Sequence, residues 1–167
     1  LTVHGSGTFE GGDLLLVNPD LALIGVGLRT NPAGVRQVTQ LLQGVGVSEV
    51  QPVPVPEDSI HLDCAYSIVG PNLALCNERH YAPEAADALR RHGVRLLTVP
   101  DCEENALGLA INVVALAPGV VVMPAGCPTT RRLLHTAGAE CIEIAIDELM
   151  KGGGAVHCVT GVLEREG

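Results

Sequence analysis

Aromatic side chains are almost missing from this chain, which has no tryptophan and only 2% aromatic residues in total. Hydrophobic residues nevertheless occupy 47% of its 167 positions. The core must therefore be built from Val, Leu, Ile and Ala, a composition typical of buried strands covered by small helices. A chain of this length can bury one sizeable core, which predicts a single α/β domain.

Positive charge is also scarce, because 10 Lys and Arg residues stand against 19 Asp and Glu residues, for a net charge of -9. A nucleic-acid partner would require Lys and Arg for its phosphate backbone, so we expect none. An acidic protein of this kind instead favours a small cationic ligand.

Paired cysteines are absent: none of the six cysteines belongs to a Cys-x-x-Cys pair. This excludes the usual local ligand pairs of a structural zinc site and argues against a disulfide framework. We therefore expect free thiols in a reducing cytoplasm, of which at most one is reactive. The six are Cys64, Cys76, Cys102, Cys127, Cys141 and Cys158.

Long uninterrupted apolar runs are missing as well. The most apolar stretch, residues 107–125, is broken by Asn112, Pro118 and Pro124, so we expect no membrane span, and Pro118-Gly119 predicts a turn between two strands. No secretory signal is visible at the N-terminus. Because the chain starts at Leu1 and reaches a motif by residue 10, we expect further sequence upstream.

A strand–strand–helix–strand pattern occurs three times along the chain. The first unit has expected strands at 14–17, 21–26 and 49–55 and a helix at 33–42. The second has strands at 64–69, 73–76 and 95–99 and a helix at 83–92. The third has strands at 110–115, 120–123 and 141–146, a helix at 129–137 and a last strand at 155–163 after a Gly152-Gly153-Gly154 run.

The chemically distinctive residues recur with the same period. Glu10, His61, Asn105 and Cys158 open successive segments and lie about 50 residues apart, a spacing that indicates a radial or stacked repeat architecture. Residues at equivalent places would then meet around a common axis; the alternative is a coincidence common to α/β chains. Three units and a strand cannot close a ring of about five, so about two units would come from an upstream segment or a companion chain.

Three motifs carry a resemblance to a known superfamily: residues 9–13 (FEGGD), 61–63 (HLD) and 152–158 (GGGAVHC). They resemble the guanidino-group modifying enzymes, whose fold is a five-bladed α/β propeller, and their order and spacing are most similar to those of dimethylarginine dimethylaminohydrolases. Residues 24–31, 70–72 and 97–101 also resemble the corresponding segments of these hydrolases. Asp63 departs from this pattern, because those hydrolases usually carry Lys there, whereas His-x-Asp is more typical of arginine deiminases and amidinotransferases.

The resemblance implies a catalytic set of Cys158, His61 and Glu10. Cys158 would attack the guanidinium carbon as a thiolate. His61 would protonate the departing amine and then activate water to cleave the S-alkylthiouronium intermediate. Glu10 would pair with the guanidinium nitrogens and orient His61. Because neighbouring side chains on a strand point to opposite faces, we expect His157 to pack away from the site.

The resemblance also implies substrate contacts. Arg29 would grip an α-carboxylate, and Gly152 would offer a backbone carbonyl to the α-amino group. Asp63 would bind a guanidinium nitrogen or fix His61. Asp13 would contact the ligand or hydrogen-bond its own glycine turn. A further acidic ligand of the guanidinium is expected upstream.

The function expected is hydrolysis of arginine or Nω-methylated arginine to citrulline plus ammonia or an amine. The alternatives are an amidinotransferase, which passes the amidino group to an acceptor amine, and a repeat module without activity. No metal or organic cofactor is required by this chemistry, although zinc could inhibit by capturing Cys158 and His61. The expected partner is a small guanidino compound, and a homodimer remains open.

Overall fold

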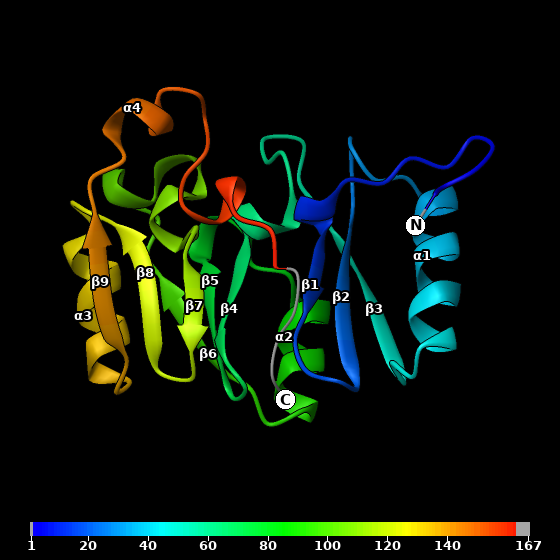
Figure 1. Cartoon of the computed structure of the whole chain (residues 1–167), viewed down its shortest axis with the longest axis horizontal. Helices are drawn as coiled ribbons and strands as arrows, with labels where there is room; N and C mark the ends of the chain where they lie inside the picture. The colour runs from blue at the N-terminus through cyan, green and yellow to red at the C-terminus, as the bar shows by residue number, and fades with distance from the viewer. Residues whose placement is uncertain (1, 163–167) are drawn as a thin grey trace.

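The chain folds into three consecutive strand–strand–helix–strand units, each with a three-stranded sheet of its own (Figure 1). The computed structural model describes residues 2–162, without the side chains of residues 107 and 108. The first unit comprises β1 (Leu14–Leu16), β2 (Leu21–Val26), α1 (Pro32–Gly44) and β3 (Glu49–Pro54); the second β4 (Tyr66–Gly70), β5 (Leu73–Asn77), α2 (Pro83–Arg91) and β6 (Arg95–Val99); the third β7 (Val114–Ala117), β8 (Val120–Pro124), α3 (Pro128–Thr136) and β9 (Glu140–Ile144).

Each sheet has the same topology. The first two strands form an antiparallel hairpin, and the helix then carries the chain back so that the third strand pairs with the second in parallel. Local chemistry sets the turns: in the first hairpin Asn18 Oδ1 accepts from the N–H groups of Asp20 and Leu21, both at 2.9 Å. In the third hairpin Gly119 supplies a positive φ of 79°.

Alternation along the middle strand explains how the units stack. In β2, Leu21 and Leu23 belong to the core shared with the second unit, whereas Ala22 and Ile24 belong to the core beneath α1. All four side chains have no exposed surface. Successive residues of a strand point to opposite faces, so β2 is covered on both sides, by its own helix and by the next unit.

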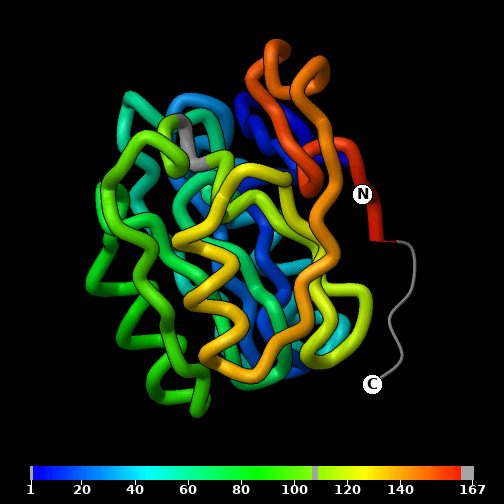
Figure 2. The backbone as a smooth tube through the Cα atoms, turned by 90° about the vertical axis from the view of Figure 1, so that its left-hand side faces the viewer, coloured from blue at the N-terminus to red at the C-terminus, as the bar shows by residue number. Residues whose placement is uncertain are grey.

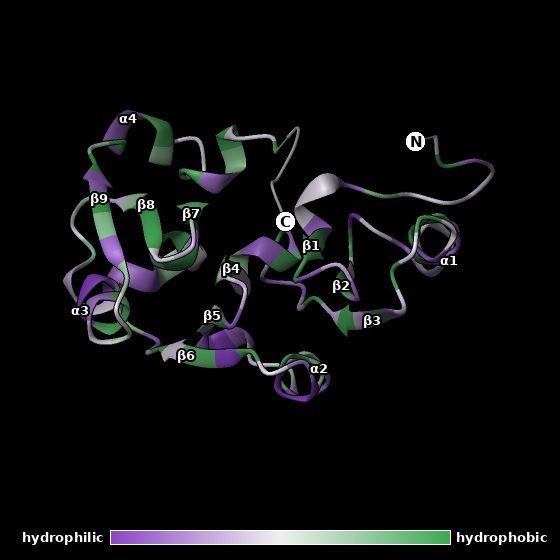
Figure 3. Ribbon diagram, turned by 60° about the horizontal axis from the view of Figure 1, so that its bottom comes forward, coloured by the Kyte–Doolittle hydropathy of each residue, from purple (hydrophilic) through white to green (hydrophobic). Residues whose placement is uncertain are grey.

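The contacts of the helices and of the first strands show that the three units follow one another along an arc. Helix α2 contacts β3 of the preceding unit and α3 contacts β6, while β1 contacts β4 and β4 contacts β7. Figure 3 accordingly shows the helices on the periphery and β1, β4 and β7 on the inner side. The loops that precede these inner strands therefore gather at one end of the molecule, which is the upper end in Figure 1.

A turn of 3-10 helix stands where the sequence predicted strand on two occasions. The third unit opens with a 3-10 helix from Glu103 to Ile111, and β7 starts only at Val114, so the strand expected at 110–115 was placed too early. The last strand, expected at 155–163, is wrong for its described part, because a 3-10 turn spans His157–Val159. Leu163 lies outside the described residues.

The segment between the third unit and this last turn carries a short helix, α4 (Asp147–Met150). Figure 2 shows it rising above the sheets, in orange, before the chain returns to the end where the inner loops gather. Within residues 2–162, no helix has the length and apolar character that crossing a bilayer requires.

Candidate functional site

Glu10 and His61 form a close pair across the first and second units. His61 Nε2 lies 2.6 Å from Glu10 Oε2, and the Glu10 backbone N–H donates to Thr30 Oγ1 at 3.1 Å. A Cβ on Gly12 would approach the His61 ring to 2.7 Å, so glycine is needed for this close approach. The hydrogen bond to His61 is the largest influence on the pKa of Glu10, and together with the charge of Arg29 it holds that pKa below its ordinary value despite some desolvation.

Arg29 contacts the second carboxylate oxygen of Glu10, the one that His61 does not contact. Arg29 Nη1 donates to Glu10 Oε1 at 3.3 Å, and the two side chains are 52% and 42% exposed. The carboxylate of Glu10 is thus shared between an imidazole and a guanidinium. The structure therefore places Arg29 at the site, where its guanidinium contacts the Glu10 carboxylate.

Asp13 connects the first motif to the second. Its carboxylate is 1% exposed, and its Oδ1 accepts from the backbone N–H of Leu62 at 2.9 Å. Gly25 makes room for it, since a Cβ there would come within 2.5 Å of the same oxygen. The described contact holds the turn of His61 and Asp63 against the first unit, whereas the sequence had suggested a ligand contact or a bond within the glycine turn.

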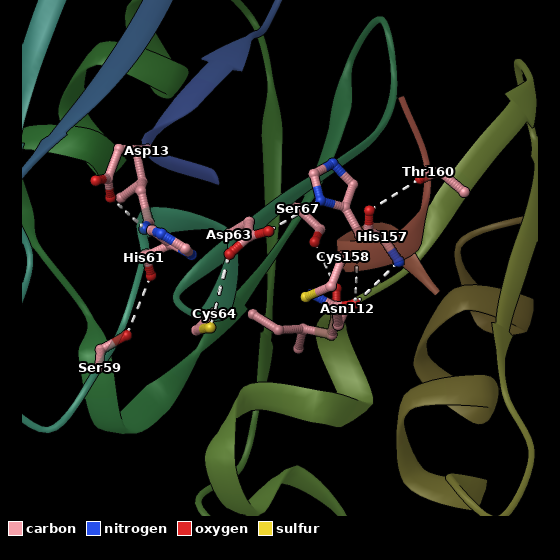
Figure 4. Close-up of polar contacts among 12 residues, drawn as sticks. Asp13, Ser59, His61, Asp63, Cys64, Ser67, Asn112, His157, Cys158 and Thr160 are labelled. Carbon is pink, nitrogen blue, oxygen red and sulfur yellow. Dashed lines mark hydrogen bonds and ion pairs between the residues drawn. The ribbon is translucent and has the colours of Figure 1, made fainter. Parts of the chain in front are cut away.

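Asp63 is buried and paired with the residue that precedes Cys158. Its side chain is 4% exposed, and His157 Nδ1 lies 3.0 Å from its Oδ2 (Figure 4). Cys64 Sγ is 3.6 Å from the other oxygen. His157 therefore reaches into the site, and the expectation that it packs away is wrong because residues 157–159 form a 3-10 turn and not a strand.

Cys158 is exposed and is held by Asn112, a residue that sequence reasoning had treated only as an interruption of an apolar run. Asn112 Oδ1 accepts from the backbone N–H groups of His157 at 2.9 Å and of Cys158 at 3.3 Å. Asn112 Nδ2 donates to Cys158 Sγ at 3.3 Å (Figure 4). The usable signal was a polar amide in the most apolar stretch of the chain, where a buried amide must have partners.

His61, Asp63, His157 and Cys158 line one open cavity of ≈ 800 Å³. The glycines of the third motif shape its rim: Gly153 has a φ of 81°, and a Cβ on Gly154 would come within 3.1 Å of the Cys158 Cβ. Gly152 also lines the cavity. The wall includes Gly11, Gly12, His61, Asp63, Cys64, Gly152, Gly153, Gly154, His157 and Cys158.

The other cysteines differ from Cys158 in their surroundings. Burial raises the pKa of Cys64 to about 12 and the pKa values of Cys76 and Cys127 to about 11. These three groups are therefore neutral thiols near pH 7. Among the described residues, no group of three or more His, Cys, Asp or Glu side chains is arranged to hold a metal ion.

An exposed thiol, an imidazole with a carboxylate partner and a second, buried carboxylate thus face one cavity, an arrangement suited to nucleophilic attack and proton transfer on a cationic carbon centre. A family model described as arginine deiminase matches residues 2–78 and 74–165 of the chain. The chain belongs to the arginine deiminase family.

Curated relatives of this family member are about twice as long. An uncharacterized protein of Bacillus subtilis, YkgA, is 30% identical over 158 residues, which cover 95% of this chain and 53% of that protein. An arginine deiminase of Mycobacterium avium is 28% identical over 186 residues, which cover 94% of this chain and 46% of that protein. The chain spans about half the length of the curated relatives it matches.

Solved structures of guanidino-group enzymes share the fold. A mutant DDAH from Pseudomonas aeruginosa complexed with citrulline has a TM-score of 0.75 at 28% identity, over 91% of this chain and 55% of that one. An adduct of dimethylarginine dimethylaminohydrolase with 4-chloro-2-hydroxymethylpyridine has a TM-score of 0.76 at 30% identity, over 93% and 58%. SxtG, an amidinotransferase from Microseira wollei, is alike in fold alone, with 17% identity and a TM-score of 0.81 over 96% and 46%. The resemblance drawn from the three motifs is confirmed.

Proposed function

We propose that this chain carries the nucleophile and the acid–base pair of a cysteine-dependent hydrolase that acts on the guanidinium group of arginine or Nω-methylated arginine. The observation that carries the proposal is the gathering of Cys158, His61 and Asp63 on one cavity, with Glu10 at 2.6 Å from His61. These residues come from the beginning, middle and end of the chain, and a structural scaffold has no need of an exposed thiol beside an imidazole and two carboxylates.

The proposed reaction has two halves. The Cys158 sulfur attacks the guanidinium carbon, and the bond from that carbon to the departing nitrogen breaks as His61 transfers a proton to the amine. Water then adds to the carbon of the S-alkylthiouronium intermediate and gives one proton to His61. The carbon–sulfur bond breaks, so Cys158 leaves as thiolate, the second proton of water passes to solvent or to the released amine, and the oxygen of water becomes the ureido oxygen of citrulline.

The carboxylates have separate parts in this proposal. Glu10 precedes Gly11, which lines the cavity; it is ionised, orients His61 and binds a guanidinium nitrogen. Its present partner, Arg29, is half exposed. When a substrate guanidinium occupies Glu10, Arg29 is released to bind the substrate carboxylate. Asp63 accepts an N–H from the reacting guanidinium, a contact that a dimethylated nitrogen cannot make.

We further propose that the three units are part of a five-bladed α/β propeller completed by an upstream segment. Helices α2 and α3 each cover the sheet of the unit before them, whereas Leu116 and Ile142 on the third sheet are 61% and 40% exposed. Exposed apolar side chains on a sheet face favour a missing neighbour. Mass spectrometry under native conditions tests this: an upstream segment that binds one-to-one supports it, and a dimer of this chain that excludes the segment contradicts it.

Product analysis tests the hydrolase. The complete protein is incubated with arginine or asymmetric dimethylarginine in isotopically labelled water, with Cys158→Ser as the control. We expect labelled citrulline, together with ammonia or dimethylamine, from the wild type alone. An amidinated acceptor amine formed in place of labelled citrulline would instead identify a transferase. Absence of turnover in the complete protein would contradict both activities.

We also propose that the reaction takes place in the cytoplasm, where the free thiols of the chain stay reduced.

A further inference from the structure

Asp58 lies in the loop that leads from β3 to His61, and its carboxylate is bound from the second unit. Arg79 Nε and Nη2 both donate to Asp58 Oδ2, at 3.0 and 2.9 Å. His80 Nε2 lies 3.4 Å from the other oxygen, Oδ1. Both partners belong to the 3-10 turn Glu78–His80, which follows β5. One turn of the second unit therefore contacts both oxygens of a carboxylate in the loop before His61.

The imidazole of His80 is buried, with a side chain 5% exposed. Asn77 Oδ1 accepts from the Arg79 backbone N–H at 3.1 Å, which assigns Asn77 Nδ2 to the contact with His80 Nδ1 at 3.5 Å. Nδ1 is then the acceptor, so the neutral ring carries its proton on Nε2. No hydrogen-bond acceptor lies within normal reach of this Nε2 in the part of the chain that the structure describes. The Asp58 carboxylate, at 3.4 Å, is therefore the group that compensates the buried N–H.

Ser59 connects this anchor to His61. Its side chain belongs to a residue only 5% exposed, and its Oγ donates to the His61 carbonyl at 3.1 Å. Its backbone N–H closes the turn that contains Asp58. The next residue, Ile60, lines the cavity. His61 is thus fixed from the first unit through Glu10 on its ring, and from the second unit through the loop that Asp58 anchors.

The contact between Asp58 and Arg79 is local in its effect. The two side chains are 50% and 57% exposed, and an ion pair between half-exposed groups contributes little to global stability. The hydrogen bond from Arg79 holds the pKa of Asp58 below its usual range, so the carboxylate is ionised near neutral pH. What this charge does is to join an exposed loop to a turn that contains a buried imidazole.

We propose that Asp58, bound by Arg79 and His80, is a positioning residue for His61 in proton transfer. An imidazole must lie within hydrogen-bond reach of the departing nitrogen, and a misplacement of about 1 Å costs about a hundredfold in rate. The role in turnover rests on the proposed function. The anchoring of the loop does not depend on the substrate.

The first test compares turnover with alkylation in Asp58→Ala, made in the complete protein. The substrate is arginine or asymmetric dimethylarginine, whichever the wild type converts faster, and the second reaction is alkylation of Cys158 by iodoacetamide. Iodide departs without a proton, so alkylation needs no imidazole. We expect kcat to fall about tenfold, with KM and the alkylation rate within about twofold of the wild type. A general loss of structure would lower both rates alike.

Two further variants sharpen this comparison. Arg79→Lys keeps the charge and one donor, so its kcat should lie between those of the wild type and Asp58→Ala. The matched control is Arg90→Ala, which removes an exposed ion pair with Asp87 on α2 of the same unit and should follow the wild type. A wild-type kcat in Asp58→Ala, or an equal fall of kcat and alkylation, would overturn the proposal.

The second test follows the loop itself and needs no substrate. Hydrogen exchange of the peptide 56–62, measured by mass spectrometry, should become about tenfold faster in Asp58→Ala. The double variant with Arg79→Ala should match Asp58→Ala alone, because both changes remove the same contact. Wild-type exchange in Asp58→Ala would overturn the anchoring. Faster exchange in a protein whose wild type shows no turnover would contradict the hydrolase and leave the anchoring of the loop supported.

Discussion

Glu10 Oε2 and His61 Nε2 lie 2.6 Å apart although 51 positions separate the two residues in the chain. The contact exists because each residue directly precedes the inner part of its unit, and those inner parts lie side by side at one end of the fold. We therefore propose two functions for Glu10, which are to orient an imidazole and to provide negative charge for a cationic ligand.

Replacing Glu10 by Gln should reduce the preference of Cys158 for a cationic alkylating agent. We expect the ratio of the rates with chloroacetamidine and with its neutral analogue chloroacetamide to fall about tenfold, since one charge-assisted hydrogen bond contributes about 1.5 kcal/mol or more. The exposed Glu57→Gln serves as the control and should keep the wild-type ratio. An unchanged ratio in Glu10→Gln would mean that another group recognises the cation.

The same rate ratio should depend on pH in a defined direction. The pKa of Glu10 is lowered, first by the hydrogen bond with His61, so its carboxylate stays ionised below the ordinary value of 4.5. The contribution of Glu10 should therefore be complete above that value and be lost only as the pH falls through the lowered pKa. The ratio for the wild type should approach that of Glu10→Gln in that acidic range, and loss of the difference already near neutral pH would contradict the assignment.

His157→Leu should destabilise the protein through Asp63. The substitution leaves a 4% exposed carboxylate without its imidazole partner, and an unsatisfied buried polar group costs about 2 kcal/mol. Urea unfolding measures the loss, and Asp63→Asn combined with His157→Leu should recover part of it because the buried charge is then removed. No loss in His157→Leu would contradict a stabilising contact, and equal losses in the single and double variants would contradict the buried charge as its cause.

Tyr66→Phe probes the contact between β4 and the start of α2 within the second unit. The fully buried Tyr66 hydroxyl donates to the Ala82 carbonyl at 3.1 Å and accepts from the Ala82 N–H at 2.7 Å. Its removal leaves the Ala82 N–H unpaired, whereas the Ala82 carbonyl keeps the Ala86 N–H at 3.1 Å, so we expect a loss of about 1–2 kcal/mol in the free energy of unfolding. Tyr81→Phe, at a tyrosine 47% exposed, is the matched control and should change stability by less than about 0.5 kcal/mol. Equal effects of the two substitutions would show that the Tyr66 hydroxyl does not stabilise the fold.

Much of the fold follows from local sequence signals. Each long helix begins with proline at its first position, and the strand at Arg95–Val99 coincides with its predicted range. The last predicted strand failed because the β-prone residues after Gly154 are held by side chains from elsewhere in the chain, and local propensity contains no information about them. The first strand of the third unit was placed too early for a similar reason, since the apolar run before Asn112 forms a 3-10 helix.

The site residues also divide into those that local sequence signals predict and those that they do not. The motifs identified Glu10, His61 and Cys158 because the repeat spacing predicts where they meet. Asn112 and the contact of His157 with Asp63 depend on partners 46 and 94 positions away, and no local pattern specifies which buried amide or imidazole will face them. Single-sequence reasoning therefore reached the residues expected to react with substrate and missed those that hold them in place.

We propose that Cys158 is the nucleophile of a site that recognises a cation, and intact mass after incubation with chloroacetamidine near neutral pH is the decisive test. We expect one adduct on the wild type, located at Cys158, and none on Cys158→Ser, because Cys158 is the exposed cysteine on the cavity. Burial raises the pKa values of Cys64, Cys76, Cys127 and Cys141, and Cys102 does not line the cavity. Equal labelling of several cysteines, or a wild-type rate no higher than that with chloroacetamide, would contradict it.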